Sequence, residues 1–388
     1  KSLKPQLRFK EFTDAWEQRK LGDFGSVCMN KRIFKNQTSE NDEIPFYKIG
    51  TFGGKADAFI SRSLFEEYKS KYPYPVCGDI LISASGSIGR TVEYQGAEEY
   101  FQDSNIVWLN HRNTIHNPFL KYFYAVVKWN GIEGSTIKRL YNENILNTQI
   151  TLPQKPEQQK IGTFFSNLDN LITLHQRKLD KLSNVKKALL EKMFPKNDSD
   201  VPEIRFKGFT DAWEQRKFGD IVQTRRGLTY KPTDIEESGI RVLRSSNIDE
   251  DTFVYGVDDV FVNPYAVNIE PVRKNDILIT SANGSSRLVG KHALIKKISD
   301  GSAVHGGFML LGRTKNYDFV NASMSSSWYT KFINVFAAGG NGAIGNLNKN
   351  DLDEQVILIP DDAEQIKIGE YFAALDNLIT LHQRKISS

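Results

Sequence analysis

Two long segments of this chain each occur twice, and this internal repeat limits its possible folds more than any other feature. The stretch RFKEFTDAWEQRKLGD at residues 8–23 returns as RFKGFTDAWEQRKFGD at 205–220. The stretch IGTFFSNLDNLITLHQRK at 161–178 returns as IGEYFAALDNLITLHQRK at 368–385. Chance does not produce two such near-identities in the same order, so the chain is predicted to be a tandem duplication of one structural unit.

Weaker similarities fill the interior of the two units, again in the same order. DILIS at 79–83 corresponds to DILIT at 276–280, and each is followed by a loop rich in Gly and Ser. IPFYK at 44–48 corresponds to IRVLR at 240–244. Most other positions between the near-identical borders differ. Stability alone does not sort a chain in this way, so the pattern predicts one scaffold that presents two different binding surfaces.

Residues 157–196 are predicted to form one long helix. Apolar residues recur there every three or four positions, which is the spacing of one helix face, and Pro195 ends the pattern. The copy from Glu364 onward keeps this stripe as far as 388, and the sequence contains no counterparts of 181–196 in it. A stripe longer than one globular face needs favours pairing of the two helices; packing of each helix on its own domain is the alternative.

The interior of each unit mixes strands with helices. Short buried strands are predicted at 80–82 and 277–279, and amphipathic helices at 118–129 and 319–335. The predicted fold class is α/β in the mixed α+β sense, with two domains in tandem, long antiparallel coiled-coil helices that join them, and an internal pseudo-two-fold repeat. The predicted boundaries are a first domain at 1–156, a central helix at 157–196, a second domain at 197–363 and a distal helix at 364–388.

The charge balance and the composition narrow the class of protein. The chain has 51 Lys and Arg against 47 Asp and Glu, a net charge of +4. Proteins that coat duplex DNA without sequence preference usually carry a stronger basic bias, so any DNA binding here must depend on local clusters. Two cysteines exclude a disulfide scaffold, and no apolar run is long enough for a membrane span. These features are typical of a globular protein of the cytoplasm.

The sequence contains no recognisable catalytic motif. It has no Walker-type phosphate loop, no Asn/Asp-Pro-Pro-aromatic loop of an amino-methyltransferase, and no metal-binding spacing among its six His residues. The pair Asp361-Asp362 is predicted to cap a helix rather than to bind a metal. Catalysis by this chain is therefore not expected.

Three features resemble the specificity subunit of type I restriction–modification systems. They are the order domain–helix–domain–helix, the pre-helical stretches PQKPEQQKI at 153–161 and PDDAEQIKI at 360–368, and GDILIS at 78–83. The FTDAWEQRK border resembles versions from staphylococci and related Firmicutes. The resemblance covers essentially the whole chain. It implies two target recognition domains, each of which recognises one half of a bipartite DNA site.

The same resemblance implies partners and cofactors. It implies a complex, in the cytoplasm of a bacterium, of this chain with double-stranded DNA and two copies of an adenine-N6 methyltransferase subunit, with or without restriction subunits. The methyltransferase subunits are expected to use S-adenosylmethionine, and the restriction subunit ATP with Mg²⁺. This chain itself is expected to bind no cofactor and no metal and to have no catalytic centre.

Residues that contact DNA are expected in loops where the two units correspond. Base readout needs donors such as Arg, Lys, Asn and Gln at groove depth, and phosphate contacts use Lys, Arg, Ser and backbone amides. An ordinary turn or a solvated charge is the alternative at each position. The predicted DNA-binding residues are Lys31, Arg32, Lys48, Thr51, Ser85, Ser87, Arg90, Arg225, Arg226, Arg244, Ser246, Asn247, Asn283, Ser285 and Arg287.

Residues that both units share suit a role that is performed twice, such as binding two copies of one partner subunit. Core packing at equivalent places is the alternative. The predicted partner-binding residues are Trp16, Trp213, Leu168, Leu171, Ile172, Leu375, Leu378 and Ile379.

Two interpretations from other functional classes remain open at this point. A self-contained methyltransferase or nuclease with unrecognised motifs would bind S-adenosylmethionine on its own. A helix-paired adaptor that binds protein or carbohydrate would show no sequence-selective DNA binding when the methyltransferase is present.

Overall fold

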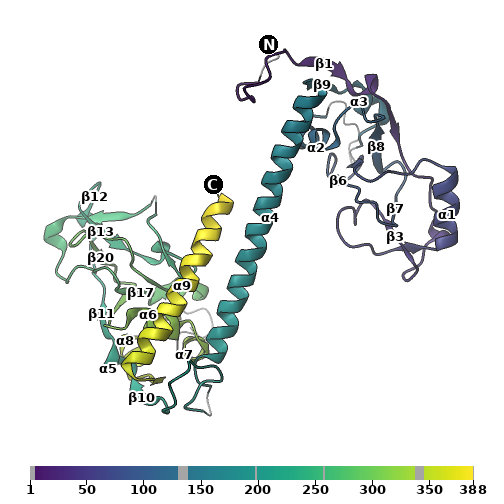
Figure 1. The fold of residues 1–388 in the computed structure, drawn as a ribbon. Coiled ribbons are helices and arrows are strands. Elements are labelled where there is room, and N and C mark those ends of the chain that lie inside the picture. The colour runs from purple at the N-terminus through teal and green to yellow at the C-terminus, as the bar shows by residue number, and fades with distance from the viewer. Residues whose placement is uncertain (1–4, 130–138, 197–198, 257, 337–344, 388) are drawn as a thin grey trace. The chain divides into compact units, whose positions relative to one another are not determined.

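The computed structural model describes residues 5–129, 139–196, 199–256, 258–336 and 345–387 (Figure 1). The chain divides into two compact units, unit 1 at Lys1–Thr173 and unit 2 at Leu174–Ser388. The division falls inside the long helix α4 (Lys155–Lys192). This helix begins two residues before its predicted start and ends four residues before its predicted end.

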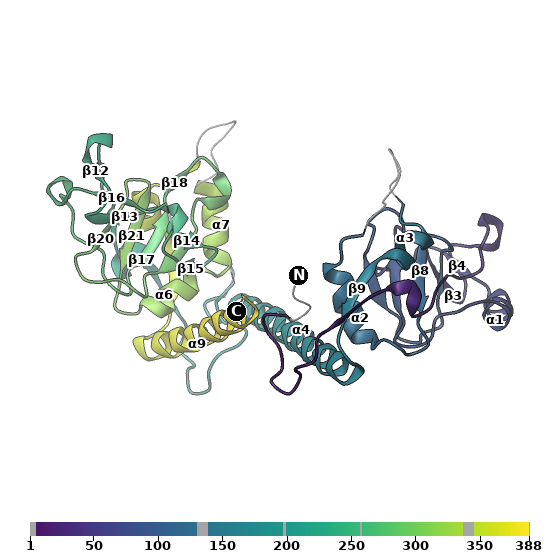
Figure 2. The same ribbon diagram turned by 90° about the horizontal axis from the view of Figure 1, so that it is seen from above.

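Unit 1 contains two small sheets. In Figures 1 and 2 the sheet that contains β3 lies, with α1, on the opposite side of the other sheet from α4. The strands in sheet order are β2 (Ser26–Cys28), β8 (Ile106–Asn110), β5 (Ile80–Ser83) and β6 (Thr91–Glu93), then β4 (Phe59–Ile60), β3 (Ile44–Tyr47) and β7 (Tyr100–Phe101). A separate ribbon pairs β1 (Glu17–Lys20) with β9 (Gln149–Leu152). The helices are α1 (Arg62–Lys71), α2 (Asn117–Val126), α3 (Asn142–Asn147) and the first part of α4.

Unit 2 repeats this plan with additional short strands. Its sheets contain β11 (Gln223–Arg226), β21 (Met309–Arg313), β17 (Ile277–Thr280) and β19 (His292–Leu294), then β12 (Ile235–Glu236), β16 (Val260–Val262), β13 (Ile240–Leu243) and β20 (Ala303–His305). Three two-stranded ribbons pair β10 (Glu214–Lys217) with β23 (Val356–Ile359), β14 (Ile248–Asp249) with β15 (Thr252–Phe253), and β18 (Ala282–Asn283) with β22 (Gly345–Asn346). The helices are α5 (Phe218–Ile221), α6 (Tyr317–Met324), α7 (Ser327–Phe336), α8 (Lys349–Glu354) and α9 (Asp362–Ser387).

The two units share sheet order and register. Leu81 of β5 pairs with Trp108 of β8, and Leu278 of β17 pairs with Leu311 of β21. A parallel strand pair, β3 with β7 and β13 with β20, occurs in each unit. The strands predicted at 80–82 and 277–279 are confirmed, and all their residues are buried. Successive side chains of a strand point to opposite faces of the sheet, so the register decides which residues are buried. Because the two units have the same register, paired residues at corresponding places are structurally equivalent.

One predicted helix is interrupted in the structure. The pattern at 319–335 forms two helices, α6 and α7, which are separated at Ser325 and Ser326. The hydroxyl of Ser325 donates to the Asn321 carbonyl at 3.1 Å, and that of Ser326 donates to the Ser323 carbonyl at 2.7 Å. Such local bonds compete with the helical backbone pattern, which explains the break. The other predicted helix ends at Val126 rather than 129.

Within unit 2, the second part of α4 runs antiparallel to α9 (Figure 1). His175 Nδ1 lies 2.8 Å from His382 Nδ1, and Phe194, just after α4, packs on Phe372. The ammonium of Lys186 pairs with Asp376 of α9 at 2.6 Å and with Asp251 of the β14–β15 turn at 2.7 Å. The predicted cap of α9 is confirmed: the Glu364 amide donates to the Asp361 carboxylate at 2.8 Å.

The near-identical borders form the same ion pair in both units. The Arg8 guanidinium donates two 2.7 Å hydrogen bonds to the Glu157 carboxylate, and Arg205 donates two of the same length to Glu364. These bonds raise the pKa of both arginines. Each pair ties the border segment to the start of the helix that follows its domain. The shared sequence therefore has a structural role at these positions.

In the described part of the chain, no helix combines the length and the apolar character needed to cross a membrane.

Candidate nucleic-acid interface

In unit 1, the turn after β3 and the loop after β5 lie together, and both carry predicted DNA-binding residues. The Arg90 guanidinium donates to the Gly53 carbonyl at 3.4 Å. A Cβ at Gly86 would lie 3.6 Å from the Ile49 side chain, so the backbones of the two loops approach closely. Ser87 and Arg90 are exposed at this surface, and Thr51 is half-buried.

The turn after β3 has the same construction as the turn after β13 of unit 2. The amide of Lys48 donates to Thr51 Oγ1 at 3.1 Å, and the amide of Arg244 donates to Asn247 Oδ1 at 2.8 Å. In the parallel strand pairs, the residues before these two, Tyr47 and Leu243, face Phe101 and His305. Lys48 and Arg244 therefore occupy equivalent positions, as the sequence comparison predicted.

Polar contacts link the loops of unit 1 to the turn between β7 and β8. Asn105 Oδ1 accepts a hydrogen bond from Ser85 Oγ at 2.7 Å and one from Arg139 Nη2 at 3.1 Å. Arg32 pairs with Asp103 at 2.8 Å, and its side chain is mostly exposed. Ser85 is buried and its hydroxyl is used to fix the loop, so the structure does not place it at the surface where its neighbours Ser87 and Arg90 lie.

Two further cations of unit 1, Lys48 and Lys31, are predicted DNA-binding residues. Lys48 pairs with Asp57 at 2.8 Å, and both side chains are exposed. The ammonium of Lys31 lies 5.0 Å from the centre of the Tyr72 ring, and the carbonyl of Lys31 accepts a hydrogen bond from Tyr100. An exposed ion pair such as Lys48–Asp57 is weak, so the Lys48 ammonium can exchange Asp57 for a phosphate.

In unit 2, the corresponding loops line a cleft of about 690 Å³. It brings together three predicted residues, Arg244, Ser246 and Asn283. The remaining lining residues are Leu228, Thr229, Tyr230, Pro232, Ile235, Ser245, Asp258, Ala282, Gly284, Gly306, Gly307, Phe308 and Met309. Ser285 and Arg287 are exposed on the loop that follows Gly284.

The polar groups of the cleft are held in defined orientations. The Arg244 guanidinium donates to the backbone carbonyl of Asp258 and, at 3.3 Å, to its carboxylate. Asn283 Nδ2 donates to Ser245 Oγ at 2.9 Å, and its Oδ1 accepts the Ser285 amide at 2.9 Å. A guanidinium that is fixed on one edge presents its remaining donors as a planar fork, which suits a guanine edge or a phosphate.

Asn247 does not face the cleft. Its side chain is fully buried, its Oδ1 closes the turn, and its Nδ2 donates to the Val254 carbonyl at 3.1 Å and to Asp259 at 2.7 Å. All its hydrogen-bonding groups are occupied inside the protein. The sequence-based prediction is corrected here: Asn247 shapes the loop that carries Arg244.

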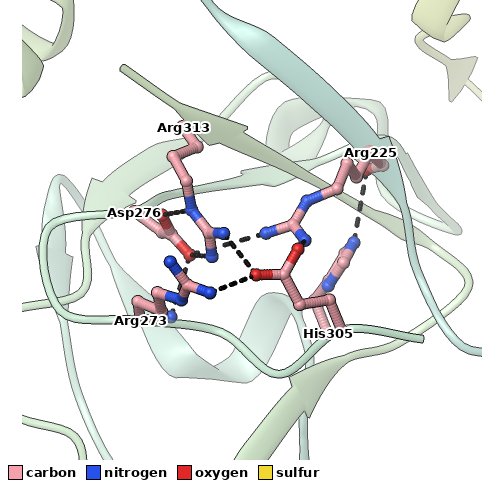
Figure 3. A network of polar contacts seen from close by, with 6 residues as sticks. Arg225, Arg273, Asp276, His305 and Arg313 are labelled. Carbon is pink, nitrogen blue, oxygen red and sulfur yellow. Dashed lines mark hydrogen bonds and ion pairs between the residues drawn. The ribbon is translucent and has the colours of Figure 1, made fainter. Parts of the chain in front are cut away.

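Arg225 is not among the residues that line the cleft. It lies in a network of charged residues (Figure 3). It pairs with Glu270, which also binds Arg313 at 2.6 Å and Arg273 at 2.7 Å. Arg313 donates two further bonds, of 2.8 and 2.7 Å, to the buried Asp276. Hydrogen bonding to Arg313 lowers the pKa of Glu270. Arg225 is therefore engaged by acidic residues within unit 2 and does not line the cleft, and its assignment to DNA stays a prediction.

The same network includes a buried histidine. His305 is 1% exposed, and its Nε2 lies 3.2 Å from the Arg225 carbonyl. Burial lowers the pKa of His305 to about 4. Register places Phe101 at the equivalent position of unit 1.

The basic pairs Lys31-Arg32 and Arg225-Arg226, which each follow a near-identical border, do not occupy equivalent positions in the two units. In unit 2, Arg225 of β11 pairs with Leu311 of β21. The residue of unit 1 that is equivalent to Leu311 is Trp108. It pairs with Cys28, which lies three positions before Lys31. Arg226, next to Arg225, is exposed.

The predicted partner-binding residues separate into a buried and an exposed set. Trp213 is 3% exposed and packs on Phe194 and Phe319, and Leu375 is also in the core, so core packing is their role. Trp16 is half-buried; its ring packs on Phe119. The side chains on the helices that remain available are Leu168, Leu171, Ile172 and Leu378, which are exposed, and Ile379, which is half-buried.

Sequence reasoning missed the turns that precede β8 and β21. Asp103, Asn105 and Phe308 come from these turns, and Tyr230 comes from the loop after β11. These turns lie beside the loops of the candidate interface because β7 and β20 pair in parallel with the distant strands β3 and β13. A local sequence signal for that pairing is absent.

The model of the type I restriction modification DNA specificity domain matches this chain twice, at residues 13–184 and 210–388. The chain belongs to this family of type I specificity subunits. A proposed type I restriction enzyme specificity subunit of Haemophilus influenzae is 55% identical over 157 residues, which are 39% of this chain and 41% of that relative. The MjaVIII specificity subunit of Methanocaldococcus jannaschii is 22% identical over 95% of this chain and 88% of its own.

The solved structure of another specificity subunit has a fold similar to that of this chain. The crystal structure of the type I restriction–modification S subunit from M. genitalium superposes with a TM-score of 0.57 at 16% identity, over 99% of this chain and 95% of that chain. At this identity the likeness concerns the fold alone. The mixed fold with two tandem domains, predicted from the repeat, agrees with it.

Proposed function

We propose that this specificity subunit recognises a bipartite, asymmetric DNA site, with one half-site read by each unit. The observation that carries the proposal is the pair of equivalent turns after β3 and β13. In both turns the backbone amide of the first residue donates to a side-chain oxygen three residues on, but one turn presents Lys48 beside Asp57 and the other presents Arg244 in a cleft. Equal scaffolds with unequal donors suit two half-sites of different sequence.

The repeat also supports a role in assembly. Exposed apolar side chains of the helices, such as Leu171 and Leu378, belong to segments that are identical in both units. We propose that they dock two copies of an adenine-N6 methyltransferase subunit, in a complex with or without a restriction subunit. Catalysis and cofactors belong to these partners in the proposal: S-adenosylmethionine to the methyltransferase, ATP and Mg²⁺ to the restriction subunit. This chain contributes the specificity.

The experiment that tests the proposal is a methylome. This chain is co-expressed with its cognate modification subunit in a host without DNA methylation, and N6-methyladenine is mapped across the genome. A single bipartite, asymmetric motif is expected. No methylation from an assembled complex would contradict the proposal and favour an adaptor that binds something other than DNA.

A domain exchange tests the assignment of one half-site to each unit. Replacing residues 25–150 by the corresponding segment of another specificity subunit is expected to change one half of the motif and to leave the other unchanged. A change in both halves would show that the units do not read DNA independently.

A further inference from the structure

Phe308 is a large apolar side chain that the fold leaves in solvent. It is 74% exposed and lies in the turn between β20 and β21, where it lines the cleft with Arg244 and Asn283. An exposed phenylalanine contributes little to the stability of unit 2, since its ring gains little burial. Its position beside polar, oriented groups indicates a contact with a ligand.

The backbone of this turn is fixed by hydrogen bonds, so the ring projects from a defined point. The Phe308 carbonyl accepts the amides of Ser281 and Ala282 at 2.9 and 3.1 Å. A Cβ at Gly306 would lie 3.2 Å from Val242 and 3.9 Å from the Arg244 stem, so a glycine lets the turn pass close to the arginine. Arg244 and Phe308 therefore line the same cleft from adjoining turns.

The equivalent residue of unit 1 has the opposite chemistry. The amide of Ala84 donates to the Asn105 carbonyl at 2.7 Å, which is the bond that Ser281 makes to Phe308 in unit 2. Asn105 is polar and binds Ser85 and Arg139. The scaffold tolerates a polar residue here, so the fold does not require the aromatic ring of unit 2.

We propose that Phe308 is a specificity-determining residue whose ring makes an apolar contact with a base in the half-site read by unit 2, next to the base that Arg244 contacts. The inference rests on the proposed function. Apolar side chains read the 5-methyl group of thymine in the major groove, and they also insert between base steps in the minor groove. Both modes are apolar contacts with bases, and the experiment separates them.

The first arm compares methylomes of the co-expressed complex that carries wild-type chain, Phe308→Ala or Tyr265→Ala. Tyr265 is the matched control because it is an aromatic residue of unit 2, 98% exposed, that does not line the cleft. Phe308→Ala is expected to relax one or two adjacent positions of a single half-site, and Tyr265→Ala to leave the motif unchanged. An unchanged motif for Phe308→Ala, or equal relaxation by both variants, overturns the inference.

The second arm identifies the contact. Affinity of the complex is measured for duplexes in which thymine at the relaxed position is replaced by deoxyuridine, which removes only the methyl group. About tenfold weaker binding by wild type, and no loss for Phe308→Ala, supports the methyl contact. A relaxed position with equal affinity for both duplexes supports insertion at that step. If the wild-type complex yields no bipartite motif, the proposed function fails rather than this inference.

Discussion

In unit 1 the turn after β3 carries Lys48, whose ammonium pairs with the exposed Asp57, whereas the same turn in unit 2 carries Arg244, whose guanidinium is held by Asp258. Both turns are closed by a side chain three residues on, Thr51 or Asn247. The units thus keep the bonds that shape the backbone and differ in the groups that reach solvent. Recognition can therefore diverge between the units without a change of fold.

The largest effect is expected from breaking an ion pair of the border. Glu364→Ala leaves the nearly buried Arg205 without its carboxylate, and loss of one partner of a buried pair costs about 3–5 kcal/mol. Urea unfolding of the full chain measures the loss. Glu157→Ala is the matched variant in unit 1, where Arg8 loses its partner. Because the two pairs have the same geometry, costs of similar size are expected; a cost below about 1 kcal/mol at either site would contradict a shared structural role.

The second prediction compares the stability cost of truncating two leucines at equivalent positions of the repeat, Leu375 and Leu168. Leu375→Ala is expected to destabilise unit 2 by about 2–4 kcal/mol, because Leu375 is 8% exposed and lies in the core. Leu168→Ala is expected to cost less than about 1 kcal/mol, because Leu168 is 43% exposed. Thermal and urea unfolding provide the comparison. In a pull-down, Leu168→Ala should weaken the modification subunit's binding if that face docks it, and equal destabilisation by both variants would refute the distinction.

Arg244→Ala is expected to weaken DNA binding by about 1–3 kcal/mol and to relax one position of the half-site read by unit 2. Lys48→Ala should affect the half-site read by unit 1, with little loss of base preference if its ammonium contacts a phosphate. Affinity at several salt concentrations and the methylome of each variant measure both effects. If Arg244→Ala changes neither the affinity for DNA nor the methylated motif, Arg244 does not contact DNA.

The smallest effect concerns the pH dependence of unit 2. Because burial lowers the pKa of His305 to about 4, the unfolded chain takes up a proton near pH 6.5 that the folded chain does not accept until about pH 4. Stability is therefore lost as the pH falls through this window, by about 1–2 kcal/mol between pH 7 and 5. His305→Phe, which introduces the residue of unit 1, should flatten that slope. Hydrogen exchange of unit 2 peptides at pH 7 and 5 measures the slope, and an identical slope in the variant would falsify this account.

Features that depend on local sequence were predictable. The repeat, the strands after Asp79 and Asp276, the long helix and the cap at Asp361 follow from identity, apolar runs and capping residues, and the structure confirms them. The break at Ser325 and Ser326 was missed because the apolar period continues across it. Side-chain bonds to the helix backbone decide that break, and hydrophobic spacing does not reveal them.

The sequence alone could not predict which candidate residues are buried or already bonded within the protein. Arg225 and Asn247 have the residue types of DNA contacts, but Glu270 from a distant segment pairs with one nitrogen of Arg225, and Asp259 from a folded-back segment accepts from the Asn247 amide. Trp213 becomes a core residue only because Phe194 and Phe319 arrive from elsewhere in the chain. Tertiary contacts of this kind have no periodicity in the sequence.

The two carboxylates around Lys186 bear on any replacement of the divergent interior of unit 2 by that of another chain. Asp376 belongs to α9, whereas Asp251 belongs to the divergent interior of unit 2, and Lys186 itself is on α4. A domain transplanted between the shared borders brings its own residue to the position of Asp251, while the lysine stays behind. A transplanted interior with an acid at that position can form the ion pair with Lys186 of α4. An interior without an acid there lacks this contact between the domain and the helix. A replaced interior must therefore be compatible with Lys186 as well as with the loops of the candidate interface.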